Sequence, residues 1–390
     1  MIKLLWKSDY ELNYEKVEWS GTDTQASRQV VFTIPTNHYD KGFSNAKIQL
    51  GDLIHLYDGK TQLFVGIVTS REKSAAIGTT SYTAKDFMHY LLRSNTSRIF
   101  RNKTPEQIVK NVCKEVGVQC GNLAKTKVNI PKLIFDDQTI YDIIIKAYRK
   151  ASGTTKKKYM PKMEGKKLTI IVKGQDSKVT LDQAKDITDA TYSDTTDNMV
   201  NLVRIYNDKK KQIGKVQNKT LTKKYGIYQS TYTKEKGVNA KKEAESMFVG
   251  VTQEASVKAI GKIGAIAGRS IVIYESATGL SGKFYVTSDT HTFENGIHTM
   301  QLQLAWRNTM ESGADTESSS KSKTKKKTHS RSAVAYYLED GKAYHSTPSC
   351  SALAGKNPRK TTVAAVLKIV NKRGKNKGKP KYKKCEKCWR

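Results

Sequence analysis

The chain has 390 residues, of which 37% are hydrophobic and 27% charged, a composition that excludes a disordered chain and a membrane-spanning one. It carries 69 Lys and Arg against 36 Asp and Glu. The resulting net charge of +33 favours polyanionic neighbours: nucleic acid, an anionic cell wall or acidic proteins. The first nine residues reach an acid before any apolar run forms, so we expect synthesis in the cytoplasm without a signal peptide.

The first region, residues 1–95, has the pattern of a β domain. Residues 30–34 are a short β-branched run, and residues 52–57 and 63–68 flank the turn formers Asp58-Gly59-Lys60, which predicts a hairpin. His55 lies inside one of these strands, and we interpret it as a structural side chain.

Residues 96–174 are expected to be a helical or mixed insertion. Thr104, Pro105 and Gln107 form a capping box with proline at the first helical position. The helix that follows places Cys113 on its apolar face, so we interpret this cysteine as a core residue rather than a nucleophile. A second helix is predicted from about Thr139 to Gly153, followed by a strand at 167–172.

Residues 175–310 are predicted to be a second β domain, interrupted by one helix near 240–250. Its glycines at 261, 264 and 268 do not have the spacing of a phosphate-binding loop, and we interpret them as turns. We therefore expect an α+β, mainly β fold: two β-barrel-like domains with inserted helices, then a small hairpin–helix module. The expected strands are residues 200–206, 270–274, 283–287 and 299–305.

Residues 311–332 contain no large apolar side chain, and we expect a flexible linker there. The remaining residues, 333–390, are long enough for one small module. A β-hairpin that ends at His345 is predicted first, and a helix capped by Thr361 follows later. The apolar face of that helix is predicted to consist of Val363, Val366, Leu367 and Val370, with Gly374 near its end.

This C-terminal module contains a Cys/His pattern with metal-ligand spacing. His345, Cys350, Cys385 and Cys388 follow the pattern H-x4-C-x34-C-x2-C. Three thiolates and one imidazole are the donor set of a closed tetrahedral zinc site, and the same set also accommodates iron. Such an ion would supply folding energy that a small module lacks. A Cys385–Cys388 redox pair and a disulfide that involves Cys350 are the alternatives.

The C-terminal module resembles small Cys/His metal-binding modules that are appended to some secreted nucleases and alkyl-transfer repair proteins. The resemblance is to the motif and not to a nuclease. Residues 315–390 carry 21 Lys and Arg against five Asp and Glu. This excess either keeps a small module soluble or contacts an anionic cell wall or nucleic acid.

Several stretches of residues 1–310 resemble the baseplate hub proteins of contractile phage tails and phage-tail-like bacteriocins. These stretches are apolar and rich in turns, and none is a catalytic signature. The similar stretches are residues 17–26, 28–34, 51–57, 66–72, 267–268, 270–274, 282–286 and 291–293.

The resemblance implies a ring-shaped homotrimer at the base of the tail tube, where it adapts six-fold symmetry to three-fold symmetry and carries a central spike. The implied partners are the tail tube protein, the spike, baseplate wedge proteins and the tape measure protein. The implied location is the tail baseplate of a virion or bacteriocin particle. We expect a structural role without catalysis, with the metal-binding module at the puncturing tip, wall contact through basic residues, and at most transient DNA contact.

Two other functions are weighed against this hub. The first is a DNA-binding protein with a zinc module, although helix-turn-helix and C2H2 finger spacings do not occur in the sequence. The second is a tail-associated cell-wall hydrolase. A nucleophile elbow and an H-E-x-x-H motif do not occur, whereas a pair of carboxylates distant in sequence remains open.

Overall fold

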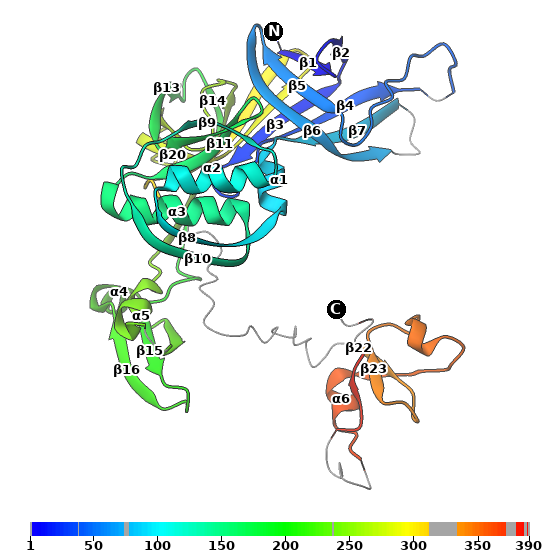
Figure 1. Ribbon diagram of the computed structural model, residues 1–390, viewed down its shortest axis with the longest axis vertical. Helices are drawn as coiled ribbons and strands as arrows, with labels where there is room; N and C mark the ends of the chain where they lie inside the picture. Colours follow the sequence, from blue (N-terminus) through cyan, green and yellow to red (C-terminus); the bar gives the residue numbers. More distant parts are fainter. Residues whose placement is uncertain are drawn as a thin grey trace. The chain divides into compact units, whose positions relative to one another are not determined.

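The structure is a computed structural model, and it describes residues 2–37, 39–73, 78–235, 238–311, 334–371, 380–385 and 388 (Figure 1). It consists of two units, Met1–Thr316 and Glu317–Arg390, which are treated separately below. The described residues form 25 strands and six α-helices, which confirms the α+β, mainly β class. None of these helices has the length and apolar character needed to cross a membrane. Apart from Glu311, the expected linker lies outside the described residues.

Thirteen strands of the first unit form one hydrogen-bonded sheet in the order β14-β18-β21-β20-β3-β4-β7-β6-β5-β1-β2, with β19 beside β20 and β13 beside β19. Antiparallel pairing of β3 with β20, which places Trp19 opposite His291, joins the two β regions into this sheet. The bounds are β1 Ile2–Trp6, β2 Tyr10–Glu11, β3 Lys16–Thr22, β4 Gln29–Thr36, β5 Leu53–Asp58, β6 Thr61–Lys73, β7 Gly78–Lys85, β13 Gln175–Asp182, β14 Ile187–Thr195, β18 Thr252–Ile260, β19 Arg269–Tyr274, β20 Ser281–Glu294 and β21 Ile297–Ala305.

Alternating side chains of the sheet contribute to two buried clusters, one built from β1 to β7 and one from β13 to β21. In β4, Val30, Phe32 and Ile34 are buried, while the residues between them are partly exposed. The predicted hairpin at Asp58 is confirmed, because β5 pairs with β6 and Gly59 adopts a φ of 56°. His55 is buried and contacts Ser8 and Gln62, as expected of a structural histidine.

A helical region lies between the two β regions of the sequence. Thr104 and Gln107 form the predicted capping box at the start of α2. The side chain of Thr139 accepts a hydrogen bond from the Asp142 N–H at the start of α3. α3 continues beyond Gly153 and ends at Thr155. The elements are α1 Met88–Arg93, β8 Asn95–Lys103, α2 Pro105–Glu115, β9 Gln119–Leu123, β10 Ile130–Thr139, α3 Ile140–Thr155, β11 Tyr159–Glu164 and β12 Lys167–Val172.

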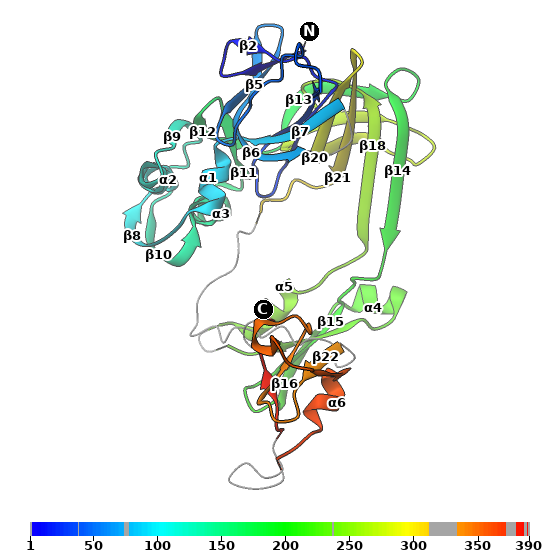
Figure 2. The ribbon, with the colours of Figure 1, turned by 90° about the vertical axis from the view of Figure 1, so that its right-hand side faces the viewer.

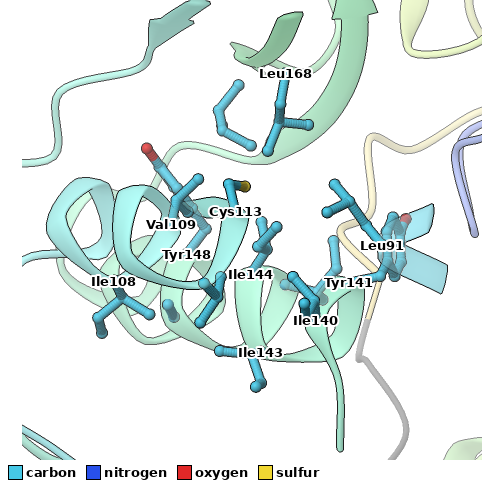
Figure 3. Packing of buried hydrophobic residues seen from close by; sticks show 14 of the residues in the cluster. Leu91, Ile108, Val109, Cys113, Ile140, Tyr141, Ile143, Ile144, Tyr148 and Leu168 are labelled. Carbon is cyan, nitrogen blue, oxygen red and sulfur yellow. The ribbon is translucent and has the colours of Figure 1, made fainter. Parts of the chain in front are cut away.

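α2 and α3 pack against each other through their apolar faces (Figure 3). Cys113 points from α2 toward the same core as Ile144 and Tyr148 of α3, and Leu168 of β12 approaches this core from the neighbouring sheet (Figure 3). Cys113 is fully buried. Its interpretation as a core residue is therefore confirmed.

Residues 200–250 form a separate small fold between β14 and β18, here called the inserted module (Figure 2). A bridge between Val200 and Val249 closes its base. Its sheet has the order β16-β15-β17. The predicted helix near residue 240 is present, but α4 was not predicted, because none of its residues is buried and it has no apolar stripe. The elements are β15 Leu202–Tyr206, β16 Gln212–Gln217, α4 Lys219–Tyr225, β17 Gln229–Thr233 and α5 Ala240–Ser246.

The second unit is a four-stranded sheet with one short helix. The strand order is β24-β22-β23-β25. The predicted helix is shorter than expected, and Thr362 rather than Thr361 caps it. Val363 and Val366 are buried, whereas Leu367 is 36% and Val370 41% exposed, so the predicted apolar face is only half correct. Gly374 lies outside the described residues. The elements are β22 Val334–Tyr337, β23 Ala343–His345, η1 Ser351–Leu353, β24 Arg359–Thr362, α6 Val363–Leu367 and β25 Lys383–Lys384.

Candidate metal centre

Two of the four predicted ligands are placed by neighbouring strands. His345 is the last residue of β23, which lies between β22 and β25 in the sheet. β25 runs parallel to β23, with Lys384 opposite Tyr344. Cys385 directly follows β25, and its N–H donates a 3.0 Å hydrogen bond to the carbonyl of Tyr344. This parallel pairing brings Cys385 beside the end of β23, where His345 lies.

The other two ligands come from turns at the same end of the sheet. Cys350 precedes the single turn η1, and its carbonyl accepts a 2.7 Å hydrogen bond from the N–H of Leu353, a core residue. Cys388 is held from the hairpin side. The N–H of Ser346 donates to its Sγ at 3.4 Å, and the hydroxyl of Ser346 donates to its carbonyl.

The four side chains converge on one point. One ligand atom from each of His345, Cys350, Cys385 and Cys388 lies within 4.8 Å of the others. The Nδ1 atom of His345 is 3.6 Å from the Sγ atom of Cys388. His345, Cys350 and Cys385 are buried, and Cys388 is partly buried. The structure therefore brings together all four residues that the sequence spacing singled out.

This arrangement fits a tetrahedral ion. Zinc–sulfur bonds of about 2.3 Å and zinc–nitrogen bonds of about 2.0–2.1 Å require a separation of roughly 3.6 Å between a sulfur and a nitrogen ligand. The observed distance between Cys388 and His345 matches this value. The three cysteines of the module are free thiols, so they form no disulfide that would compete for the sulfur atoms.

For His345 and Cys388, the surroundings favour the protonation states that a metal requires, whereas the neighbouring thiols Cys388 and Cys385 raise the pKa of Cys350. Burial lowers the pKa of His345, which keeps its imidazole neutral. Burial alone would raise the pKa of Cys388, but hydrogen bonds from the backbone N–H and the hydroxyl of Ser346, together with the neighbouring thiols, bring it below the ordinary value. A neutral imidazole and a thiolate are the forms that coordinate metal ions.

Sequence reasoning missed a buried polar network in the first unit. Arg28 donates to both carboxylate oxygens of Asp289, which also accepts a 2.7 Å hydrogen bond from the N–H of Ala267. Next to it, the Nδ1 atom of His291 lies 3.0 Å from the Nε2 atom of His298. Arg28 and Asp289 are 261 residues apart, so no local sequence motif indicates that they form a pair. The network connects β20 to Arg28, the residue directly before β4. Its role is structural.

The fold of the first unit and the appended Cys/His cluster define a mainly β protein with a small accessory module. The model of the YqbQ-like family matches residues 17–305, and the chain belongs to this family. The match ends before the second unit begins. The Cys/His module therefore lies outside the part that the family model describes.

Two curated relatives from Bacillus subtilis strain 168 are similar to the chain. One is the phage-like element PBSX protein XkdQ, which is 27% identical over 315 residues and aligns with 78% of this chain and 95% of its own length. The other is the uncharacterized protein YqbQ, with the same identity and coverage. Since these relatives align almost in full, about a fifth of this chain has no counterpart in them.

Two solved structures share the fold at low sequence identity. The 43 kDa tail protein of prophage MuSo2 from Shewanella oneidensis superposes with a TM-score of 0.61 at 12% identity and covers 78% of this chain and 98% of its own. A tail protein from Neisseria meningitidis MC58 gives a TM-score of 0.58 at 13% identity, with coverages of 78% and 95%. The predicted resemblance to phage tail proteins is confirmed.

Proposed function

We propose that the chain is the baseplate hub of a contractile tail or injection particle, where it joins the tail tube to the central spike. The observation that carries the proposal is the match of residues 17–305 to the YqbQ-like family, together with a fold shared with prophage tail proteins. One of the relatives is named as a protein of a phage-like element. The location that follows is the tail baseplate.

The proposed assembly is a homotrimeric ring. Among the strands that the structure describes, β14, β2 and β13 each pair with one neighbour only and form edges of the long sheet. A closed three-fold ring would give every copy the same heterologous contact and can cover such edges. The tail tube protein, the spike, wedge proteins and the tape measure protein are the partners that accompany this role.

In this proposal the C-terminal module is a domain that a structural zinc ion stabilises, and it lies near the puncturing tip. Among the described residues of the module the hydrophobic core is small, with eight buried members including two of the candidate ligands. A structural zinc ion contributes folding energy directly, and four protein ligands leave no open position for catalysis. Iron is the alternative occupant of the same ligands. A module whose fold is stabilised by a bound metal suits the puncturing tip, which is under mechanical load.

The test is the native mass of the full chain measured together with elemental analysis. We expect a trimer of the 43.7 kDa chain that carries one zinc per chain. A monomer without bound metal and with three readily alkylated cysteines in the module would overturn both parts of the proposal. A metal-loaded monomer would overturn only the proposed trimeric ring. A metal-free trimer would overturn only the proposed zinc site of the C-terminal module.

The position of the module is tested separately by imaging intact particles with a label at the C-terminus. We expect the label at the spike end of the baseplate. A label at the end that faces the tail tube would remove the tip assignment while leaving the hub assignment in place.

The proposed role is structural rather than enzymatic, in keeping with relatives that are named as tail and phage-element proteins. A zymogram on cell-wall material tests this part of the proposal. We expect no clearing by the purified chain, and clearing would support the wall-hydrolase alternative instead.

A further inference from the structure

The inserted module carries an excess of positive charge that the module itself does not balance. Residues 200–250 contain 12 Lys and Arg against four Asp and Glu. The lysines that the structure describes there are all exposed. A module with so small a core, formed by four buried residues, is destabilised by repulsion among these charges. A polyanion would relieve that repulsion.

The lysines of the inserted module have no carboxylate partners within its described residues. No ion pair within 4.0 Å connects any of them to an acid. Elsewhere in the first unit, basic side chains do pair. Lys258 contacts Asp189 at 3.0 Å, and Lys262 contacts Asp186 at 2.8 Å. Other lysines of the first unit are also without an ion pair, but in the inserted module this holds for every lysine that the structure describes.

A rigid turn presents three of these lysines together. Lys209, Lys210 and Lys211 lie between β15 and β16, and all three are exposed. The side chain of Asn207 accepts hydrogen bonds from the N–H groups of Lys209 and Lys211, at 3.0 and 2.9 Å. The N–H of Asn207 also donates to the carbonyl of Lys211 at 2.9 Å. The turn is thus ordered before any partner binds, which reduces the entropic cost of binding.

The sheet beside this turn has one face covered and one face polar. Val203 and Val216 pair across β15 and β16 and share a buried cluster with Ala244 of α5. The opposite face carries the cross-strand pair Arg204 and Lys215. Arg204 donates to glutamines on both neighbouring strands, at 2.6 and 2.9 Å, which holds its guanidinium against the sheet. The turn between β15 and β16 and this face of the same two strands both carry cationic side chains, and together they are here called the cationic region.

We infer that the inserted module binds the phosphodiester backbone of double-stranded DNA without regard to base sequence. Duplex DNA carries one negative charge per roughly 1.7 Å of its axis, and lysines that neutralise its phosphates release the counterions condensed on it. The four tyrosines of the module are only partly exposed, so the module lacks the open aromatic platform that single strands require. The inference goes beyond the hub role and does not depend on it or on the metal centre.

The test uses the full chain, a fluorescein-labelled 30-base-pair duplex and fluorescence anisotropy over a salt series. The test variant is K209Q/K210Q/K211Q. The chain offers a matched control in K156Q/K157Q/K158Q, because Lys156 to Lys158 form a second triple-lysine run. The middle residue of the first run and the first residue of the second have nearly equal positive φ values, 59° for Lys210 and 58° for Lys156.

We expect the test variant to bind more weakly than the wild type by about ten-fold to several-hundred-fold at 0.1 M salt. The slope of log K against log salt should also become shallower, by up to about 2.7 if all three lysines contact phosphates. The control triple should leave affinity and slope near the wild-type values. Circular dichroism spectra that match the wild type establish that both variants are folded.

Two outcomes would overturn the inference. In the first, the two triples weaken binding equally, which would assign DNA binding to the overall charge of the chain. In the second, unlabelled poly(glycerol phosphate) displaces the duplex more effectively than unlabelled duplex at equal phosphate concentration. That result would assign the cationic region to a cell-wall polymer. Loss of the metal or of the trimer in the earlier experiments would not affect either readout.

Discussion

The Nδ1 atom of His345 lies 3.6 Å from the Sγ atom of Cys388, although 43 residues separate them in the chain. Backbone pairing produces this proximity, because β25 lies parallel to β23 and Cys385 donates its N–H to Tyr344. The ligands therefore converge through hydrogen bonds of the fold itself. A metal ion bound there would fasten the last residues of the chain to the first hairpin of the module.

We predict that the double variant C385S/C388S binds no zinc. Serine retains the size of the side chain but replaces two thiolate ligands with hydroxyls, which are poor zinc ligands. The control is C120S, a substitution of a cysteine in the first unit, which should keep one zinc per chain. Elemental analysis of the purified variants checks both expectations. Retention of stoichiometric zinc by C385S/C388S would refute the assignment of these ligands.

Removal of the metal is expected to loosen the second unit and leave the first unit intact. The two units have separate cores, so folding energy from a zinc ion would be lost only where the ion binds. Limited proteolysis with and without a strong chelator measures this difference. We expect new cleavage within residues 334–388 and none within the sheet of the first unit. Equal protection of the module in both samples would contradict the proposal that a bound zinc ion stabilises it.

The ion pair between Arg28 and Asp289 predicts a large loss of stability for D289N. The Asp289 side chain is fully buried, and the neutral amide would leave the guanidinium of Arg28 without its counter-charge. Breaking a buried pair in this way costs about 3–5 kcal/mol. The matched control is D189N, because Asp189 pairs with Lys258 on the surface, where a pair contributes about 0–1 kcal/mol. Chemical denaturation of the two variants measures both losses.

The features that sequence reasoning predicted correctly depend on neighbours in the chain. The capping box of Thr104 and Gln107 is one example, since both residues lie within one helical turn. The clustering of His345, Cys350, Cys385 and Cys388 was expected for a different reason, since their types and spacing are those of metal ligands, while metal binding itself stays a prediction. Missed features depend on contacts between distant residues. The side chains of Arg28 and Asp289 meet only because β3 pairs with β20.

The inserted module shows a second reason why sequence reasoning misses an element. Its helix α4 lacks buried residues, so hydrophobic periodicity gives no signal over Lys219–Tyr225. The side chain of Asn218 does cap this helix by accepting a hydrogen bond from the N–H of Leu221. A search for caps alone would have found α4, whereas a search for apolar stripes does not.

The packing of α3 predicts different outcomes for two isoleucines of the same region. Ile144 is fully buried between α2 and α3, and I144A should cost about 2–5 kcal/mol through lost burial and a cavity. Ile134 lies on β10 and is 59% exposed, so I134A should cost less than about 1 kcal/mol. Thermal or urea unfolding of the two variants compares the same chemical change at both sites. Equal losses would contradict the core described for the helical region.

His291 makes the stability of the first unit dependent on pH. Burial lowers its pKa to about 4, the charge of Asp289 opposes this shift, and Arg28 and His298 reinforce it. In the unfolded chain its pKa is about 6.5, so between pH 6.5 and 4 the unfolded state binds a proton that the folded state excludes. Stability is therefore fully present above pH 6.5 and falls by roughly 3 kcal/mol as the pH drops to about 4.

The variant H291Q isolates this contribution, because glutamine has no titrating ring. Urea denaturation at several pH values between 7 and 4 should show a shallower loss of stability for H291Q than for the wild type. The control H89Q removes a histidine that is partly exposed and should keep most of the wild-type slope. If the slope of H291Q equals that of the wild type, the acid sensitivity originates elsewhere, and His291 is not the group that resists protonation.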